Sequence, residues 1–196
     1  MTITVLTGPS GVGKGTVVTR LIQQHPEIWL SVSATTRSPR PREVHGVNYW
    51  FISEAEFDAL IESDNLLEWA LVHGMHRYGT PSQPVLKALA EGRACLLELD
   101  LTGARRVRLK MPEVRTVFLM PPSRTELERR LRGRGTESEA ELKRRFRTAD
   151  EEYAAASEFD EIIVNGDVAK TCQELVRFMG LSPGSAGRAS NPTEGY

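Results

Sequence analysis

Residues 8–16 have the sequence Gly8-Pro9-Ser10-Gly11-Val12-Gly13-Lys14-Gly15-Thr16. An apolar run from Ile3 to Leu6 precedes them and predicts a short buried strand, and a helical pattern follows from Val17 to Ile22. A glycine-rich loop between a strand and a helix is the context that a phosphate-binding loop requires. The glycines let the backbone wrap closely around an anion, and the N–H groups at the start of the helix point toward its oxygens. The sequence therefore predicts nucleotide binding at this loop.

Two side chains of the loop are candidates for contacts with a triphosphate. Lys14 supplies a point charge where the β and γ phosphates would sit. A serine or threonine usually follows this lysine directly, but here Gly15 does, and Thr16 comes next. Thr16 is therefore the candidate for the hydroxyl near Mg²⁺, with a contact that is direct or through water. The alternative is a glycine-rich turn with an accidental lysine, which the match at several positions disfavours.

Composition limits the function classes. The 196 residues, 40% hydrophobic and 26% charged, fit one compact domain with small subdomains. A net charge of -1 gives no overall field that would favour nucleic acid or a membrane surface as partner. No apolar run is long enough to span a membrane and no signal peptide is evident, so we expect a cytoplasmic protein, as a monomer or homodimer. The cysteines, Cys95 and Cys172, are predicted to be buried thiols.

Strand patterns at residues 94–99, 116–120 and 161–164 alternate with helical patterns. This alternation predicts an α/β fold with a parallel sheet flanked by helices, in which ligands bind at the carboxyl ends of the strands. The glycine-rich loop and Asp100 both follow such strands.

The stretch from residue 33 to residue 80 interrupts this alternation and predicts an inserted subdomain. Strands are expected at 47–52 and 66–72, with a turn-rich loop at 74–81. Ser53 to Glu56 fits a capping box that opens a short helix between the two strands.

The insertion carries a cluster of arginines. Arg37, Arg40 and Arg42 lie within six residues, and Glu43 and Tyr49 follow. Guanidinium groups bind phosphate oxygens in a bidentate manner, so the cluster predicts a second phosphate site. The alternative is a solvated basic loop.

A second basic stretch covers residues 129–147, with glycines at 133 and 135 that suggest a hinge. Interleaved glutamates are also typical of a salt-bridged surface, and the absence of interleaved aromatics disfavours nucleic-acid binding. A hinged arginine-bearing segment near a phosphate-binding loop favours a lid. Two phosphate sites and a lid together suggest transfer between two phosphorylated molecules, a reaction that needs alignment and cations more than a general base.

These motifs together resemble the guanylate kinase family, from Thr4 to about Met179. The motifs that carry the resemblance are GPSGVGKGT at 8–16, SVSATTRSPRPREVHGVNYWF at 31–51, LLEWALVHG at 66–74, YGTP at 78–81, LLELD at 96–100, PPS at 121–123, RRLRGRGTESE at 129–139 and IVNGD at 163–167.

The resemblance implies a P-loop nucleoside monophosphate kinase fold over residues 1–180. Its parts would be a core (1–32, 81–124 and 148–180), a GMP-binding insertion (33–80) and a lid (125–147), with a disordered tail at 181–196. It implies transfer of phosphate from ATP to GMP, and to dGMP, with Mg²⁺ as cofactor.

The resemblance also implies roles for particular residues. The residues that match the GMP-binding residues of the family are Ser33, Arg37, Arg40, Glu43, Tyr49, Glu68, Tyr78, Thr80 and Asp100. Within that set, the arginines and tyrosines would hold the GMP phosphate, and Ser33, Glu68 and Thr80 would face guanine. Those similar to the residues around the transferring phosphate are Lys14, Arg130, Arg134 and Arg145. Asn165 would lie beside the adenine of ATP.

Three features depart from the family's usual pattern: Glu98 replaces an aspartate, Gly166 replaces another, and the segment from Gly74 to Tyr78 is one residue longer. The competing hypotheses are a nucleoside monophosphate kinase of other base specificity, a non-catalytic binding module of guanylate kinase type, and a P-loop NTPase that hydrolyses ATP without an acceptor nucleotide. The intact loop with Lys14 and Thr16 argues against the binding module.

Overall fold

The computed structural model describes residues 3–72, 75–132 and 139–181, without the side chains of 139–145. The strands are β1 (Ile3–Thr7), β2 (Ile28–Leu30), β3 (Ala34–Thr35), β4 (Trp50–Phe51), β5 (Leu66–Val72), β6 (His76–Pro81), β7 (Ala94–Glu98), β8 (Arg115–Met120) and β9 (Glu161–Val164). The helices are α1 (Lys14–Gln24), α2 (Glu54–Glu62), α3 (Ser82–Ala90), α4 (Leu101–Lys110), α5 (Arg124–Arg132), α6 (Glu139–Ala154) and α7 (Val168–Phe178), with a 3₁₀ turn at Ala156–Glu158.

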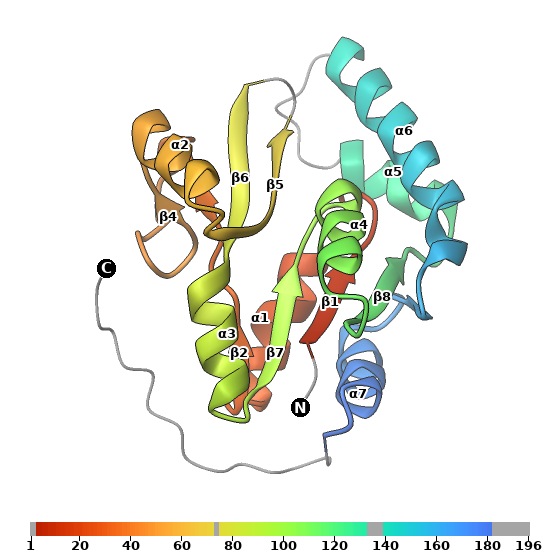
Figure 1. Ribbon diagram of the computed structural model, residues 1–196. Helices are drawn as coiled ribbons and strands as arrows, with labels where there is room; N and C mark the ends of the chain where they lie inside the picture. The colour runs from red at the N-terminus through yellow and green to blue at the C-terminus, as the bar shows by residue number, and fades with distance from the viewer. Residues whose placement is uncertain (1–2, 73–74, 133–138, 182–196) are drawn as a thin grey trace.

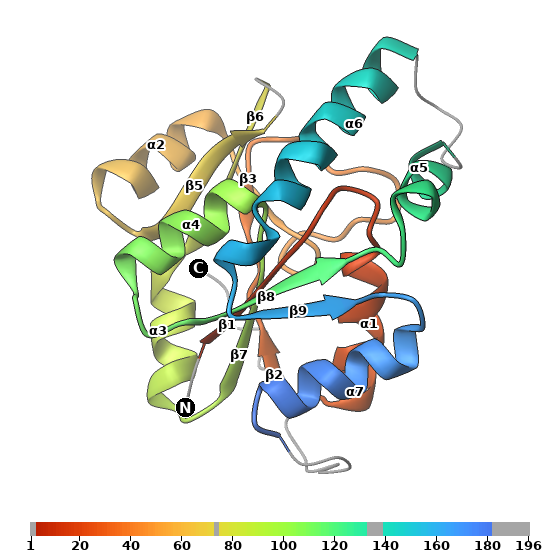
Figure 2. The same cartoon turned by 90° about the vertical axis from the view of Figure 1, so that its right-hand side faces the viewer.

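The core of the described chain is a five-stranded sheet in the order β2-β7-β1-β8-β9, and all its pairings are parallel. Figure 2 shows α1 and α7 on one face of this sheet and α3 and α4 on the other. Alternate residues of one strand supply the two faces: Leu6 packs with α1 and α7, whereas Val5 packs with α3 and α4. The expected α/β fold with a central parallel sheet is confirmed.

A smaller, four-stranded sheet in the order β4-β3-β6-β5 lies beside the core (Figure 1). It is built from the segment predicted to be an insertion, although the domain boundaries themselves stay predictions. Helix α2 packs on this sheet through Phe57, which is fully buried.

Two expectations for this segment are wrong. Residues 76–81 form β6 rather than a turn-rich loop, because they pair antiparallel with β5 from Val72↔His76 to Leu66↔Pro81. That ladder satisfies backbone groups that a loop would leave to water, and it outweighs the turn propensity of Gly79 and Pro81. The strand expected at 47–52 is only Trp50–Phe51, since residues 46–48 form a turn.

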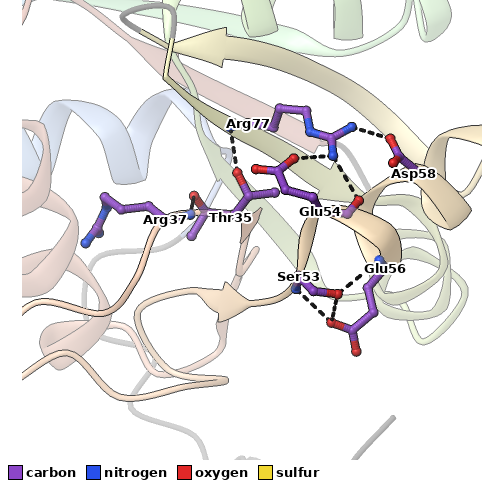
Figure 3. A network of polar contacts seen from close by, with 8 residues as sticks. Thr35, Arg37, Ser53, Glu54, Glu56, Asp58 and Arg77 are labelled. Carbon is purple, nitrogen blue, oxygen red and sulfur yellow. Dashed lines mark hydrogen bonds and ion pairs between the residues drawn. The ribbon is translucent and has the colours of Figure 1, made fainter.

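Polar contacts fix α2 against the sheet (Figure 3). The predicted capping box is confirmed, because the Ser53 hydroxyl accepts from the Glu56 N–H and the Glu56 carboxylate accepts from the Ser53 N–H. Arg77 on β6 donates to Asp58 and Glu54 of the helix, and its guanidinium lies 4.8 Å from the ring centre of Phe57. These contacts hold the N-terminal half of α2 against the small sheet.

Helices α5 and α6 follow β8, on the side of the molecule away from α2 and α3 (Figure 1). The hydroxyl of Ser123 accepts from the Glu126 N–H at the start of α5. Gly133, Gly135 and Arg134 lie outside the described residues, as does the tail from residue 182. Among the helices that the structure describes, none is both long and apolar enough to cross a membrane.

Candidate active site

The glycine-rich loop connects the end of β1 to the start of α1. Gly13 caps α1 with φ 102°, a left-handed conformation that L side chains rarely adopt, and a Cβ there would lie 2.8 Å from Nδ2 of Asn165. The first residue of α1 is Lys14, whose Nζ donates to the carbonyl oxygen of Gly8 at 2.6 Å, across the loop. Gly13 provides no side-chain cap for the N-terminus of α1, and an anion at such a helix end is stabilised by its N–H groups and the helix dipole.

The far side of the loop is held by buried polar groups. The carbonyl of Val12 accepts from Nη1 of Arg130 on α5 and from Nδ2 of Asn165, both at 2.8 Å. Asn165, only 3% exposed, also accepts from the Thr171 hydroxyl at 3.2 Å. Arg130 and Asn165 thus support the loop from behind, and their predicted contacts with phosphate and adenine stay predictions.

Glu152 on α6 belongs to this site and was not anticipated from the sequence. Its Oε2 accepts from the Ser10 N–H at 3.1 Å, and the residue is 8% exposed. Burial raises the pKa of Glu152, and the nearby charge of Lys14 opposes that rise. A signal was present: Glu152 comes one helical turn after Ala149, so a carboxylate interrupts the face of α6 that is otherwise apolar.

The end of β7 brings the loop and the insertion together. Burial raises the pKa of Glu98, the last residue of β7, and the positive charge of Lys14 opposes this. The phenol of Tyr49 has a raised pKa as well, first through burial and then through the charge of Glu98. The charge of Lys14 in the loop therefore acts on Glu98, and the charge of Glu98 acts on Tyr49 in the insertion.

The arginine cluster of the insertion is preorganised around Arg37. Its guanidinium forms a bidentate pair with Glu43 (2.9 and 3.0 Å) and donates from Nε to the Tyr78 hydroxyl at 2.9 Å. The Arg37–Glu43 hydrogen bonds raise the pKa of Arg37 and lower that of Glu43, so both stay charged at neutral pH. Tyr49 completes the cluster, with its ring 5.6 Å from that of Tyr78. Arg40 is exposed, and its N–H donates to Glu43 at 2.7 Å.

A second polar group in the insertion is buried. Glu68 on β5 is 7% exposed, and its Oε1 accepts from the hydroxyl of Thr80 on β6 at 2.7 Å. Burial raises the pKa of Glu68 to about 7, and the charge of Asp100 adds to the rise. Asp100 caps α4, because its Oδ1 accepts from the Gly103 N–H at 2.7 Å.

The remaining predicted residues are placed as follows. Ser33 is half-buried just before β3, and its carbonyl accepts from the Trp50 N–H at 2.9 Å. Thr16 is exposed in the first turn of α1. Arg134 lies outside the described residues, and Arg145 lies on α6 in the part whose side chains are not described. The structure thus brings Arg37, Glu43 and Tyr78 together in one cluster and Glu68 and Thr80 in another. The roles expected for these residues, and for the arginines of the lid, stay predictions.

Comparison with known proteins agrees with this arrangement. The family model for guanylate kinase matches residues 1–181. Curated guanylate kinases from Thermobifida fusca and Leifsonia xyli are 58% and 55% identical to the chain over 174 and 181 residues. The matches cover 89% and 92% of this chain and 88% and 71% of those proteins.

Solved structures give the same result. A guanylate kinase from Anaplasma phagocytophilum superposes with a TM-score of 0.75 at 30% identity, covering 91% of this chain and 84% of that one. A shikimate kinase from Bacteroides thetaiotaomicron, at 17% identity and a TM-score of 0.51, shares the fold alone. With a family match over nearly the whole chain and relatives above half identity, the chain belongs to the guanylate kinase family.

Proposed function

We propose that this chain transfers the γ-phosphoryl group of ATP to GMP, and to dGMP, with Mg²⁺, giving ADP and the nucleoside diphosphate. The observation that carries the proposal is the position of Glu98, which pairs with Leu6 shortly before the glycine-rich loop and lies near enough to Tyr49 of the insertion for its charge to raise the pKa of that phenol. It brings a loop suited to a triphosphate close to an arginine–tyrosine cluster suited to a monophosphate. Two phosphate sites that meet in this way suit direct transfer between two nucleotides.

The acceptor phosphate would be bound by the cluster around Arg37. The Arg37–Glu43 pair holds the guanidinium in place, so little side-chain entropy is lost when a phosphate binds. The hydroxyls of Tyr49 and Tyr78 add hydrogen-bond donors at its edge. A phosphate monoester has a second pKa near 6, so the attacking oxygen is already ionised at neutral pH and needs no general base.

The base would be read by Glu68. Guanine presents two adjacent donors, N1–H and the 2-amino group, and one ionised carboxylate accepts from both. Adenine has an unprotonated N1 at that edge and no 2-amino group, so it would leave the buried carboxylate without partners, which is costly. Thr80 holds one oxygen of Glu68 in place for this contact.

The donor phosphates would lie on the loop, with Lys14 beside them. The loop is held rigidly by Arg130, Asn165 and Glu152, so its N–H groups are arranged before the nucleotide arrives. Charge that develops on the transferring group is then stabilised without reorganisation of the protein. The positive charges of Arg134 and Arg145 are proposed to join the site from the lid.

The residues present fit a magnesium ion that is held mainly by the triphosphate. Mg²⁺ usually keeps several waters in kinase sites and needs only one or two protein oxygens. Thr16 offers an exposed hydroxyl in the first turn of α1, and the carboxylate of Glu98 lies near Lys14. When bound, the ion would neutralise charge on the β and γ phosphates.

The test is a nucleotide panel with the pure protein. ATP-dependent phosphorylation of GMP, dGMP, AMP, CMP and UMP is measured with Mg²⁺ and again with excess chelator. We expect turnover with GMP and dGMP only, and loss of turnover without metal. A preference for another base would overturn the substrate assignment, and GMP-independent ATP hydrolysis at a comparable rate would indicate an NTPase.

A further inference from the structure

Gly103 occupies an unusual position for a glycine. It is the third residue of α4, it is buried, and its φ is not in the left-handed region. Glycine is less favourable than alanine inside a helix because it loses more backbone entropy on folding. No backbone conformation requires glycine at this position, so the reason for it has to be sought in the space around it.

That space is filled by the carboxylate of Glu68. A Cβ built on Gly103 would lie 2.9 Å from Oε2 and 3.2 Å from Cδ of Glu68, and 3.2 Å from Oδ1 of Asp100. The other oxygen of Glu68 is held by the Thr80 hydroxyl at 2.7 Å. The carboxylate is therefore confined between Thr80 on one side and the bare backbone of Gly103 on the other.

We infer that Gly103 is a positioning residue for base specificity, which fixes where the Glu68 carboxylate lies by leaving room for Oε2. The inference rests on the proposed function, in which Glu68 accepts from N1–H and the 2-amino group of guanine. Two parallel hydrogen bonds need both oxygens in the plane of the base, and their strength falls steeply when the angle or distance is wrong. A methyl group at residue 103 displaces Oε2, the end of a flexible side chain, and leaves the fold intact.

The substitution Gly103→Ala therefore separates stability from recognition. Helix propensity favours alanine, so we expect the Tm to stay level or rise. Displacement of the carboxylate weakens a charged hydrogen-bond pair, so we expect kcat/KM for GMP to fall about tenfold to a hundredfold, mainly through KM. The KM for ATP, which binds at the other site, should not change. Thr102→Ala, an exposed change in the same helical turn, is the matched control and should leave all these values unchanged.

A comparison of GMP with inosine monophosphate as substrates of Gly103→Ala gives a second readout. Inosine monophosphate keeps N1–H and lacks the 2-amino group, so it makes only one of the two contacts. Gly103→Ala should reduce the preference for GMP over inosine monophosphate, because it spoils the paired geometry from which only GMP benefits. Equal proportional losses for both substrates would contradict the inference.

A double-mutant cycle with Glu68→Ala decides whether Gly103 acts through Glu68. Once the carboxylate is removed, Gly103→Ala should cause no further loss of GMP activity. An equal loss in both backgrounds, wild-type GMP kinetics for Gly103→Ala, or unfolding in both backgrounds would each overturn the inference. Restoration of folding by Glu68→Ala, should Gly103→Ala alone unfold, would support it.

The cycle also distinguishes the inference from the proposed function. Wild-type protein that does not phosphorylate GMP would refute the function itself. Wild-type protein that does so, together with an unaffected Gly103→Ala variant, would refute only the role of Gly103.

Discussion

The substitution Glu68→Gln should stabilise the protein in alkaline solution while impairing its use of GMP. The pKa of Glu68 is raised from an ordinary 4.5 to about 7, first by burial and then by Asp100, against the Thr80 hydrogen bond and the charge of Arg106. This shift corresponds to about 3 kcal/mol of free energy that the folded state loses when the buried group ionises. Glutamine keeps the shape and the Thr80 contact but carries no charge.

The sign of the pH dependence follows from proton counting. Between about pH 4.5 and pH 7 the folded protein holds a proton on Glu68 that the unfolded chain has released. The contribution of Glu68 to the free energy of unfolding therefore falls as pH rises through this window, and stays low above it. Glu68→Gln should match the wild type near the acid end and exceed its stability by up to about 3 kcal/mol at the alkaline end.

Urea unfolding of both proteins without nucleotide, in steps from about pH 5 to pH 9, measures this difference directly. Nucleotide is omitted because the phosphate of GMP itself titrates near pH 6. A stability difference that does not change with pH would refute the argument from burial.

The effect of Glu68→Gln on catalysis is measured as kcat/KM for two substrates, GMP and AMP. We expect kcat/KM for GMP to fall by about 1–3 kcal/mol, the scale of a lost charged hydrogen-bond pair. Use of AMP should fall much less, or rise, because adenine gains nothing from the carboxylate. An equal proportional loss for GMP and AMP would remove Glu68 from base reading.

Three further predictions concern the loop and the insertion. Lys14→Ala should abolish most phosphoryl transfer with unchanged circular dichroism, and near-normal turnover would show that the loop does not bind the triphosphate. Glu152→Gln, which keeps an acceptor for the Ser10 N–H, should retain far more activity than Glu152→Ala, and equal kinetics for the two variants would show that this contact does not position the loop. Arg77→Ala should lower the Tm by about 2–4 °C through loss of its contacts with α2 and Phe57, measured by calorimetry, and an unchanged Tm would mean that these contacts add no stability.

Much of the fold follows from local sequence signals. The capping box at Ser53, the apolar runs of β1, β7 and β8, and the glycine-rich loop each have a short-range physical cause, and each is found where the sequence places it. Strand β6 could not be found in this way, because its partner β5 supplies the hydrogen bonds and its own residues favour a turn.

The contacts within the site are even harder to predict from local sequence, because they join residues that are far apart in the chain. Arg37, Glu43 and Tyr78 can be proposed from a motif, but the pairing of Arg37 with Glu43 and Tyr78 depends on the sheet that brings β6 beside β3. The contact of Glu152 with the loop spans more than 140 residues of sequence, and no local pattern encodes it. Only the oddity of a carboxylate on an apolar helix face marks such a residue in advance.

Several residues that lower the stability of the fold lie around the proposed site. Glu68, Glu98 and Glu152 are carboxylates whose burial raises their pKa, and Gly103 weakens the helix that contains it. A folded chain optimised for stability alone would replace all four. The loss of stability at each position is understandable if the residue contributes to nucleotide binding. Glu68 would accept from guanine donors, Glu98 would lie beside Lys14 and the proposed magnesium ion, Glu152 would hold the loop ready for phosphate, and Gly103 would leave room for the Glu68 carboxylate. It follows that substitutions which raise the Tm at these four positions should lower activity, whereas stabilising changes at exposed positions such as Leu109 should not.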